Sequence, residues 1–385
     1  MFRSKVGRSN KASAQHNIDF VLDNIMETEV KTILLPLYVA QCFTLAPKYS
    51  IRYDLITSNS HKFNAFVFVL ATGILAAWLY YLIDYWSHSS GLLAATISMY
   101  SVPLTIAFLF NSVITTAKSN NYASLIIMLQ RILKRFKFSK IERRNVTASN
   151  WVHVVFIIVF NIIHFGFRLD YGKGIFILKI FTQFIYVSFD CNAVICMRMI
   201  SLLGKCIETW VSELHCLCQK HNRDQIEPDN SPLKTILQDY NQLIEILQIY
   251  CQVYKYTIFL MVVTSFFQVL VNVQSMMMVI VWTRSAILGP VVWIKNLVLL
   301  IFLSMEAENV YLQMKNSGLV CLLIRMKENP TDQYLDLRRV VRCQRYEAES
   351  WRGGNRPLPL DATLPPRFLA VVATYTVVIL QFKFL

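Results

Sequence analysis

TLPPRFLAVVATYTVVILQFKFL, residues 363–385, is an apolar run that is long enough to cross a bilayer as one helix. Pro365 and Pro366 stand at its start, where a helix tolerates proline because the first amide hydrogens have no intrahelical partner. We therefore expect this stretch to form a membrane helix.

The polar residues of this run fall into register. Thr374, Val378 and Gln381 are spaced i, i+4 and i+7 and so share one helix face, with Tyr375 and Phe382 on the neighbouring stripe. A thin polar stripe in a membrane helix is turned toward water or toward other protein. Two interpretations stay open: the stripe lines an ion pore, or its Thr and Gln side chains bond to neighbouring helices.

The composition indicates a single polytopic, all-α membrane domain. Of the 385 residues 55% are hydrophobic and 16% charged, whereas a soluble chain has about 25% charged residues. The net charge of +14 comes with no nucleic-acid motif, so we expect basic cytoplasmic loops and no nucleic-acid partner. Residues 1–32 are polar and basic, and we expect no signal peptide there.

The expected membrane spans are apolar segments near the required length of about 20 residues. They number seven: 63–84, 91–117, 151–168, 175–199, 257–282, 289–312 and 367–382. The segment 33–47 is shorter and is broken by prolines, so we expect it to be re-entrant or interfacial within an N-terminal part, 1–62, on the cytoplasmic side.

Lys and Arg set the expected orientation. The segments between spans 2 and 3 and between spans 6 and 7 hold eight and nine of them, so both belong inside, as does the N-terminus. Seven crossings then place the C-terminus outside. The sequon at Asn145 falls inside, and none of the nine cysteines falls in an external loop, so no disulfide framework is expected.

The cytoplasmic segments are also patterned. Residues 121–136 form a basic amphipathic helix, which we expect to lie on the inner leaflet. Segment 200–256 is expected to form a helical anchor domain below the membrane, and 313–366 is a basic segment. Within the anchor, a heptad seam packs either within the chain or between subunits. Its expected positions are Leu233, Leu237, Tyr240, Ile244, Leu247, Cys251 and Tyr254.

Residues that suggest chemistry are few. The run 215–221, HCLCQKH, lacks a fourth ligand on one helix side, so no metal site is expected. Asp190 is an intramembrane acid that either pairs with Arg198 or another helix or takes part in ion conduction or gating. His164 binds a ligand or a neighbouring helix. No catalytic motif stands out, so we expect neither an enzyme nor a cofactor.

The spacing Thr374-Tyr375, five residues, Gln381-Phe382 in a last span resembles the C-terminal signature of insect gustatory receptors. The similarity extends to Pro47-Lys48-Tyr49 before span 1 and to residues 189–203 at the end of span 4, in a form similar to lepidopteran members. Residues 346–355, YEAESWRGGN, depart from the small-residue helix usual in the family.

The resemblance implies a tastant-gated, non-selective cation channel of the plasma membrane in taste neurons, a homo- or heterotetramer of the bitter-sensing type. Thr374, Tyr375, Val378, Gln381 and Phe382 would form its pore and gate. The tastant would bind in the outer half of the bundle, where our topology places Tyr100, Phe160, His164, Phe181, Gln183, Asn272, Gln274, Trp293 and Asn296. The alternatives are a non-conducting or metabotropic subunit, or a transporter.

Overall fold

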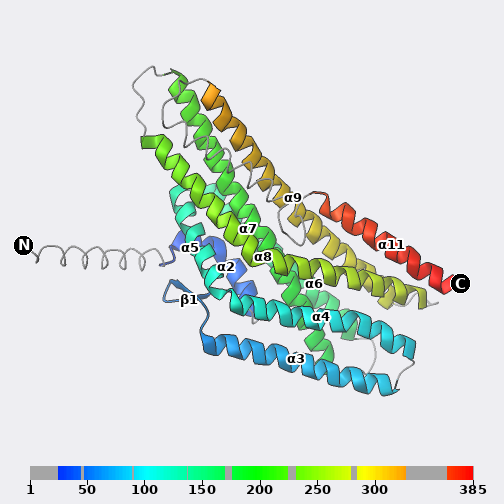
Figure 1. The fold of residues 1–385 in the computed structure, drawn as a ribbon. Helices are drawn as coiled ribbons and strands as arrows, with labels where there is room; N and C mark the ends of the chain where they lie inside the picture. Colours follow the sequence, from blue (N-terminus) through cyan, green and yellow to red (C-terminus); the bar gives the residue numbers. More distant parts are fainter. Residues whose placement is uncertain are drawn as a thin grey trace, which may run out of the picture.

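The computed structural model describes residues 25–44, 47–88, 91–136, 138–169, 176–223, 231–278, 284–326 and 362–384. Long helices run through nearly all of them, with one small two-stranded hairpin (Figure 1). In chain order the elements are α2 (Thr28–Phe43), β1 (Ser50–Arg52), β2 (Leu55–Thr57), α3 (His61–His88), α4 (Gly91–Ala117), α5 (Ser119–Phe136), α6 (Lys140–Leu169), α7 (Phe176–Arg223), α8 (Ser231–Met278), α9 (Arg284–Met326) and α11 (Leu364–Phe384).

The apolar helices identify an all-α membrane protein. Within the described residues, five helices have segments long and apolar enough to cross a bilayer, in α3, α6, α7, α8 and α9. Two shorter apolar segments, Val102–Ala117 and Leu364–Val378, lie in α4 and α11. The seven expected spans thus lie in these seven helices, in chain order, and their crossing and orientation remain predictions.

Helix α7 forms the centre of the bundle. Within its apolar segment Ile180–Cys216, 78% of the residues in the most apolar stretch are buried. The corresponding share for His61–Tyr80 of α3 is 22%. The largest packing interface in the described part of the molecule joins α7 to α9, and α7 also packs on α6 and α8. Side chains that reach α7 are therefore placed among protein, whereas most of the apolar surface of α3 is not covered by the described part of the chain.

Three helices are much longer than a bilayer crossing requires. Helices α7 and α8 have 48 residues each and α9 has 43, so each is about 65–70 Å long, roughly twice the bilayer core. In Figure 1 they run together away from α3, α4 and α11. Trp210 of α7 donates to the carbonyl of Ile236 at 3.0 Å and packs on Tyr240, which ties α7 to α8 in this part of the molecule.

The predicted heptad seam of α8 is shifted at every second position. The buried residues there include Ile236, Tyr240, Leu243, Leu247, Tyr250 and Tyr254, and Asp239, Ile246 and Val253 are buried beside them. Tyr240, Leu247 and Tyr254 are as predicted, but Leu243 and Tyr250 replace Ile244 and Cys251, which are half-buried. Both sets have alternating steps of three and four, so spacing alone does not distinguish them. The side chains of Leu233 and Leu237 lie outside the described part. The observed seam packs within the chain.

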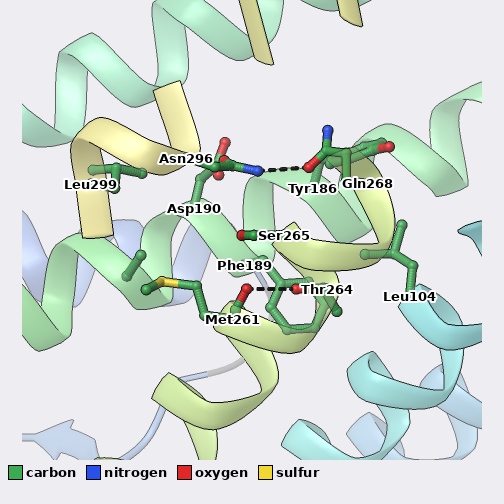
Figure 2. A pocket seen from close by; sticks show the side chains of 11 residues that line it. Leu104, Tyr186, Phe189, Asp190, Met261, Thr264, Ser265, Gln268, Asn296 and Leu299 are labelled. Atoms are coloured by element: carbon green, nitrogen blue, oxygen red, sulfur yellow. Dashed lines mark hydrogen bonds between the residues drawn. The ribbon is translucent and has the colours of Figure 1, made fainter. Parts of the chain in front are cut away.

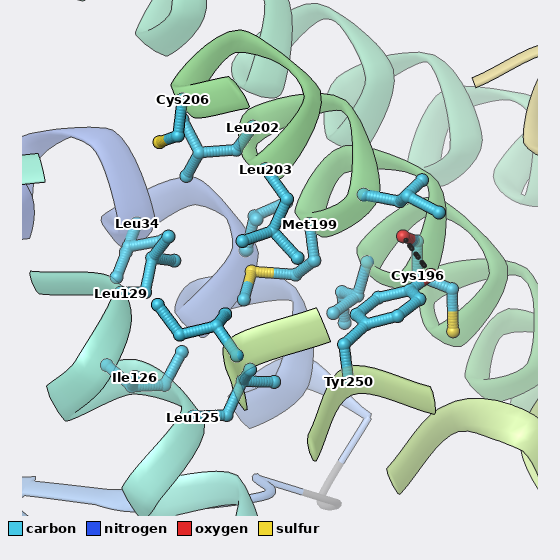
Figure 3. Close-up of a cluster of buried hydrophobic side chains, with 14 of the residues drawn as sticks. Leu34, Leu125, Ile126, Leu129, Cys196, Met199, Leu202, Leu203, Cys206 and Tyr250 are labelled. Carbon is cyan, nitrogen blue, oxygen red and sulfur yellow. Dashed lines mark hydrogen bonds between the residues drawn. The ribbon is translucent and has the colours of Figure 1, made fainter. Parts of the chain in front are cut away.

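The prediction that residues 121–136 lie on the lipid surface is wrong. The apolar face of α5 is buried against protein, in the same hydrophobic cluster as α2, α7 and α8. Figure 3 shows Leu125, Ile126 and Leu129 of α5 facing Met199 and Leu203 of α7. An amphipathic pattern indicates that a helix has one apolar face, but it does not distinguish whether lipid or protein covers that face.

Helix α2 replaces the predicted re-entrant segment with a regular helix that contains Pro36. One face, with Ile33, Leu34 and Leu37, is buried on α6 and α7. The opposite face exposes Leu35, Val39 and Phe43, spaced four apart. One apolar face thus lies against protein and the other is exposed, and a re-entrant or interfacial position of this segment remains a prediction.

Candidate functional site

A buried ion pair joins α7 to α9 at the level of the spans. Lys295 donates to both carboxylate oxygens of Asp190 at 2.5 Å, and both side chains are almost fully buried. Of the two predicted partners for Asp190, the other helix is therefore found and Arg198 is not. Arg198 instead donates to Asn150 at 2.7 Å. A buried pair of this kind is costly to break, since either charge alone is left without compensation.

A chain of hydrogen bonds leads from this pair to His164. Asn161 donates to Asp190 at 2.7 Å, and Gln183 donates to the side-chain oxygen of Asn161 at 2.8 Å. His164 Nδ1 lies 3.1 Å from the Gln183 oxygen, on the other side of the amide. The chain alternates between α6 and α7, so it fixes the register of the two helices.

Aromatic rings enclose the histidine. The rings of Phe160 and His164 are stacked with centroids 6.5 Å apart, and Tyr186 meets His164 edge-on at 5.9 Å. The Lys295 ammonium also lies 5.3 Å from the Phe160 centroid. Three of the predicted ligand residues, Phe160, His164 and Gln183, are thus brought into one network with the ion pair.

A small cavity opens beside the ion pair, among α4, α7, α8 and α9 (Figure 2). Asn296 donates to Gln268 at 2.6 Å across it, and Asp190, Thr264 and Ser265 add polar groups. The remaining lining is Leu104, Tyr186, Phe189, Ala193, Met261 and Leu299. Its volume of about 20 Å³ holds one water and no drug-sized ligand. A tastant would have to enlarge it by moving helices.

The other predicted ligand residues lie apart from this cavity. Asn272 donates to the carbonyl of Gly289 at 3.2 Å and joins α8 to α9, while Gln274 is half-buried near the end of α8. Phe181 packs against a hydrophobic cluster formed by α3, α4 and α7. Trp293 packs against a second cluster, formed by α8, α9 and α11. The side chain of Tyr100 lies outside the described part. Of the predicted residues whose side chains are described, Asn296 alone lines the cavity.

Several residues of the site were missed by the sequence prediction. Lys295, Gln268, Thr264 and Ser265 were not among the candidates, although Lys295 stands inside an apolar span. A charge at such a position is expensive and is usually paired or functional, so it was a usable signal. Gln268 and the two hydroxyl residues carry no comparable signal.

Helix α11 lies at the edge of the molecule and, among the larger contacts of the described helices, packs on α8 and α9 alone (Figure 1). Leu364, Phe368 and Val372, four apart, are buried against Val269 and Leu300. One stripe of α11 is therefore held by its own subunit.

Most of the remaining described surface of α11 is exposed. Arg367, Thr374 and Gln381 are seven apart and share one exposed stripe on a flank of the helix, about a third of a turn from the buried stripe, with Val378 between them and the buried stripe. The hydroxyl of Thr374 donates to the carbonyl of Ala370 at 2.9 Å, within the helix. The side chains of the predicted pore residues Thr374, Val378 and Gln381 are thus all exposed on the surface of their own subunit.

The neighbouring predicted stripe is only partly described. Tyr375 is 51% exposed and still touches α8, where its ring meets Phe266 edge-on at 5.4 Å. The side chain of Phe382 lies outside the described part. Tyr375 is therefore placed at the boundary between the packed and the exposed faces of α11.

Lys48, outside the spans, is completely buried between two rings. Its ammonium lies 4.3 Å from the centroid of Tyr254 on α8 and 4.9 Å from that of Tyr122 on α5. Within the described residues it has no hydrogen-bond partner. Burial lowers its pKa to about 8, while the rings attract the charged form. The predicted family motif Pro47-Lys48-Tyr49 thus attaches the segment before α3 to α5 and α8.

No described residues suggest a metal centre. Among them, no three His, Cys, Asp or Glu side chains come together in a way that could hold an ion. In the run 215–221 the side chains of Cys218 and His221 lie outside the described part.

The fold and site define a helical, multi-pass membrane protein with a buried polar network. A comparison with protein families matches residues 35–337 to the 7tm Chemosensory receptor family, and the chain belongs to this family. No curated protein matches the chain. The match confirms the predicted chemoreceptor superfamily and a place in the plasma membrane. The match ends before α11, so the resemblance of that helix to the gustatory signature remains a prediction.

Proposed function

We propose that this chemoreceptor is a tastant-gated, non-selective cation channel in which four subunits place α11 around a central pore. The observation that carries the proposal is the exposed stripe of α11. Thr374 and Gln381 are polar groups on an apolar helix, and their side chains are exposed on the surface of their own subunit. Polar groups at such positions are costly toward lipid, and a water-filled path shared with other subunits removes that cost.

The residues of the stripe fit weak ion selectivity. Four Gln381 amides around an axis offer oxygen and nitrogen dipoles without fixed charge, which solvate cations without strong preference. Val378, 38% exposed, lies about one turn below and closes a narrow pore by dewetting. The proposed gate is therefore apolar, and the four Gln381 amides surround the pore on its outer side.

The proposed ligand site is the cavity beside Asp190 and Lys295. Because the pair neutralises itself, the remaining polar groups are Thr264, Ser265 and the Gln268–Asn296 amide pair. They suit an uncharged, partly apolar ligand with a few hydroxyl or carbonyl groups. Plant compounds of the bitter class have this chemistry. A ligand that enlarges the cavity separates α8 from α9, the two helices that hold α11.

The proposed orientation keeps the N-terminus and the long ends of α7, α8 and α9 in the cytoplasm. Asn145 is exposed near the start of α6, so a glycosylating enzyme would reach it if that end were outside. We expect no glycan at Asn145 and no access of antibody to a tag at residue 140 on intact cells. Labelling of either would overturn the orientation.

The experiment for the function is expression of the chain alone with whole-cell and single-channel recording during an agonist screen. A channel shows agonist-evoked unitary currents with little preference between sodium and potassium. A non-conducting or metabotropic subunit shows surface expression without currents, and a transporter shows saturable uptake without unitary events. Either outcome would contradict the proposal.

A further inference from the structure

Two lysines meet over one tyrosine where α4 ends and the apolar part of α8 begins. The ammonium groups of Lys118 and Lys255 lie 4.8 and 4.7 Å from the ring centroid of Tyr256. Lys118 also donates to the backbone carbonyl of Gln252 on α8, so its side chain is held in place. Tyr256 is 39% exposed, and the two lysines are half-buried.

Within the part of the chain that the structure describes, no acidic side chain neutralises this cationic cluster. Within the described residues neither lysine takes part in an ion pair with an acidic group. Partial burial and then the charge of Lys255 lower the pKa of Lys118, the direction that a nearby like charge produces. Two ammonium groups that lie near one ring and repel each other are stabilised by an anion that contacts both.

The surface next to the cluster identifies the kind of anion. Helix α4 exposes an apolar stripe, Ile106, Phe110 and Val113, that ends at Ala117, directly before Lys118. A free phosphate or a nucleotide has no use for such a stripe, whereas a phospholipid has acyl chains of the right length and chemistry. Tyrosine and lysine are also the residues that mark the headgroup level of a membrane.

We propose that Lys118 and Lys255 bind the phosphate of an anionic phospholipid against Tyr256, with its acyl chains along the exposed stripe of α4. The assignment of this lipid to the cytoplasmic leaflet, which is the anionic one, rests on the orientation proposed above. The bound lipid would join α4 to α8, the helix that also contacts α11. The lipid would thereby stabilise the arrangement of α4 and α8 at their cytoplasmic ends.

The test uses the purified full-length receptor in a neutral detergent, titrated with phosphatidylserine or phosphatidylcholine. Native mass spectrometry measures the bound lipid, and thermal unfolding measures its effect on Tm. We expect phosphatidylserine to bind and raise Tm, and the variant K118Q/K255Q to weaken its binding by roughly tenfold or more. Because no agonist is used, the result does not depend on channel activity.

Three controls make the result decisive. The variant K140Q/R144Q removes two exposed charges near the start of α6 and should bind phosphatidylserine like the wild type. The variant K118R/K255R keeps both charges and should retain binding. The single variant K255Q leaves the hydrogen bond from Lys118 to the Gln252 carbonyl intact. Equal binding of phosphatidylcholine, or wild-type binding by K118Q/K255Q, would overturn the proposal. An equal effect of soluble glycerophosphoserine would show a site for free phosphoesters instead.

Discussion

The ring of Tyr375 on α11 meets the ring of Phe266 on α8 edge-on, with centroids 5.4 Å apart and an interplanar angle of 81°. Phe266 also packs against the hydrophobic cluster in which Val269 of α8 is buried with Phe368 and Val372 of α11. The aromatic pair therefore extends the packed stripe of α11 to the edge of its exposed face, between the proposed cavity helix and the proposed pore.

Loss of this aromatic pair should change how strongly agonist binding is coupled to opening. An edge-to-face pair contributes about 0.5–1.5 kcal/mol beyond its buried area, so we expect Tyr375→Leu or Phe266→Leu to shift the agonist EC50 by about two- to tenfold. A double-mutant cycle measures the coupling directly. Additive shifts of the two single variants would show that the pair carries no coupling.

Breaking the pair between Asp190 and Lys295 should destabilise the receptor more than removing both charges. Asp190→Asn or Lys295→Met leaves one buried charge unpaired, and we expect each to cost about 3–5 kcal/mol. The combined variant D190N/K295M leaves none and should recover much of the loss. The yield and Tm of the detergent-purified protein measure this, and a double variant less stable than both singles would contradict it.

The buried ammonium of Lys48 predicts a pH-dependent stability difference. Its pKa is lowered from the ordinary 10.5 to about 8, so the unfolded chain holds one more proton than the folded chain between these pH values. Wild-type stability should therefore rise relative to Lys48→Met as pH increases from 8 toward 10.5, by about 3 kcal/mol in total. Below pH 8 the difference should be constant.

Thermal unfolding of wild type and K48M between pH 7 and 9.5 measures this trend. The matched control is Lys140→Met, because Lys140 is an exposed lysine outside this cluster. A pH-independent difference for K48M would show that Lys48 is not held in the buried, low-pKa environment described here.

The apolar runs predicted most of the helical architecture because hydropathy and length act within a single segment. They did not predict what covers each helix. The pattern of α5 has one apolar face, and lipid or a protein core satisfies it equally well. The seam of α8 was misplaced for a related reason, since Leu243-Ile244 and Tyr250-Cys251 offer two apolar neighbours at each step.

The candidate site was harder to predict than the fold. Asp190 was recognisable as an intramembrane acid, but its partner Lys295 is 105 residues away in sequence. The cavity also takes residues from four helices, and its position depends on how they pack. The stripe of α11 was predictable because Thr374, Val378 and Gln381 belong to one short helix, whose packed face is now placed on α8 and α9.

The most direct test of the central claim is the conductance of Gln381→Ala, with Leu369→Ala on the flank of the same helix as control. If Gln381 amides line the pore, Q381A should change unitary conductance, block or the sodium-to-potassium permeability ratio, while L369A leaves all three as in the wild type. Unchanged conductance, block and permeability in a well-expressed Q381A receptor would contradict the assignment of α11 as the pore helix.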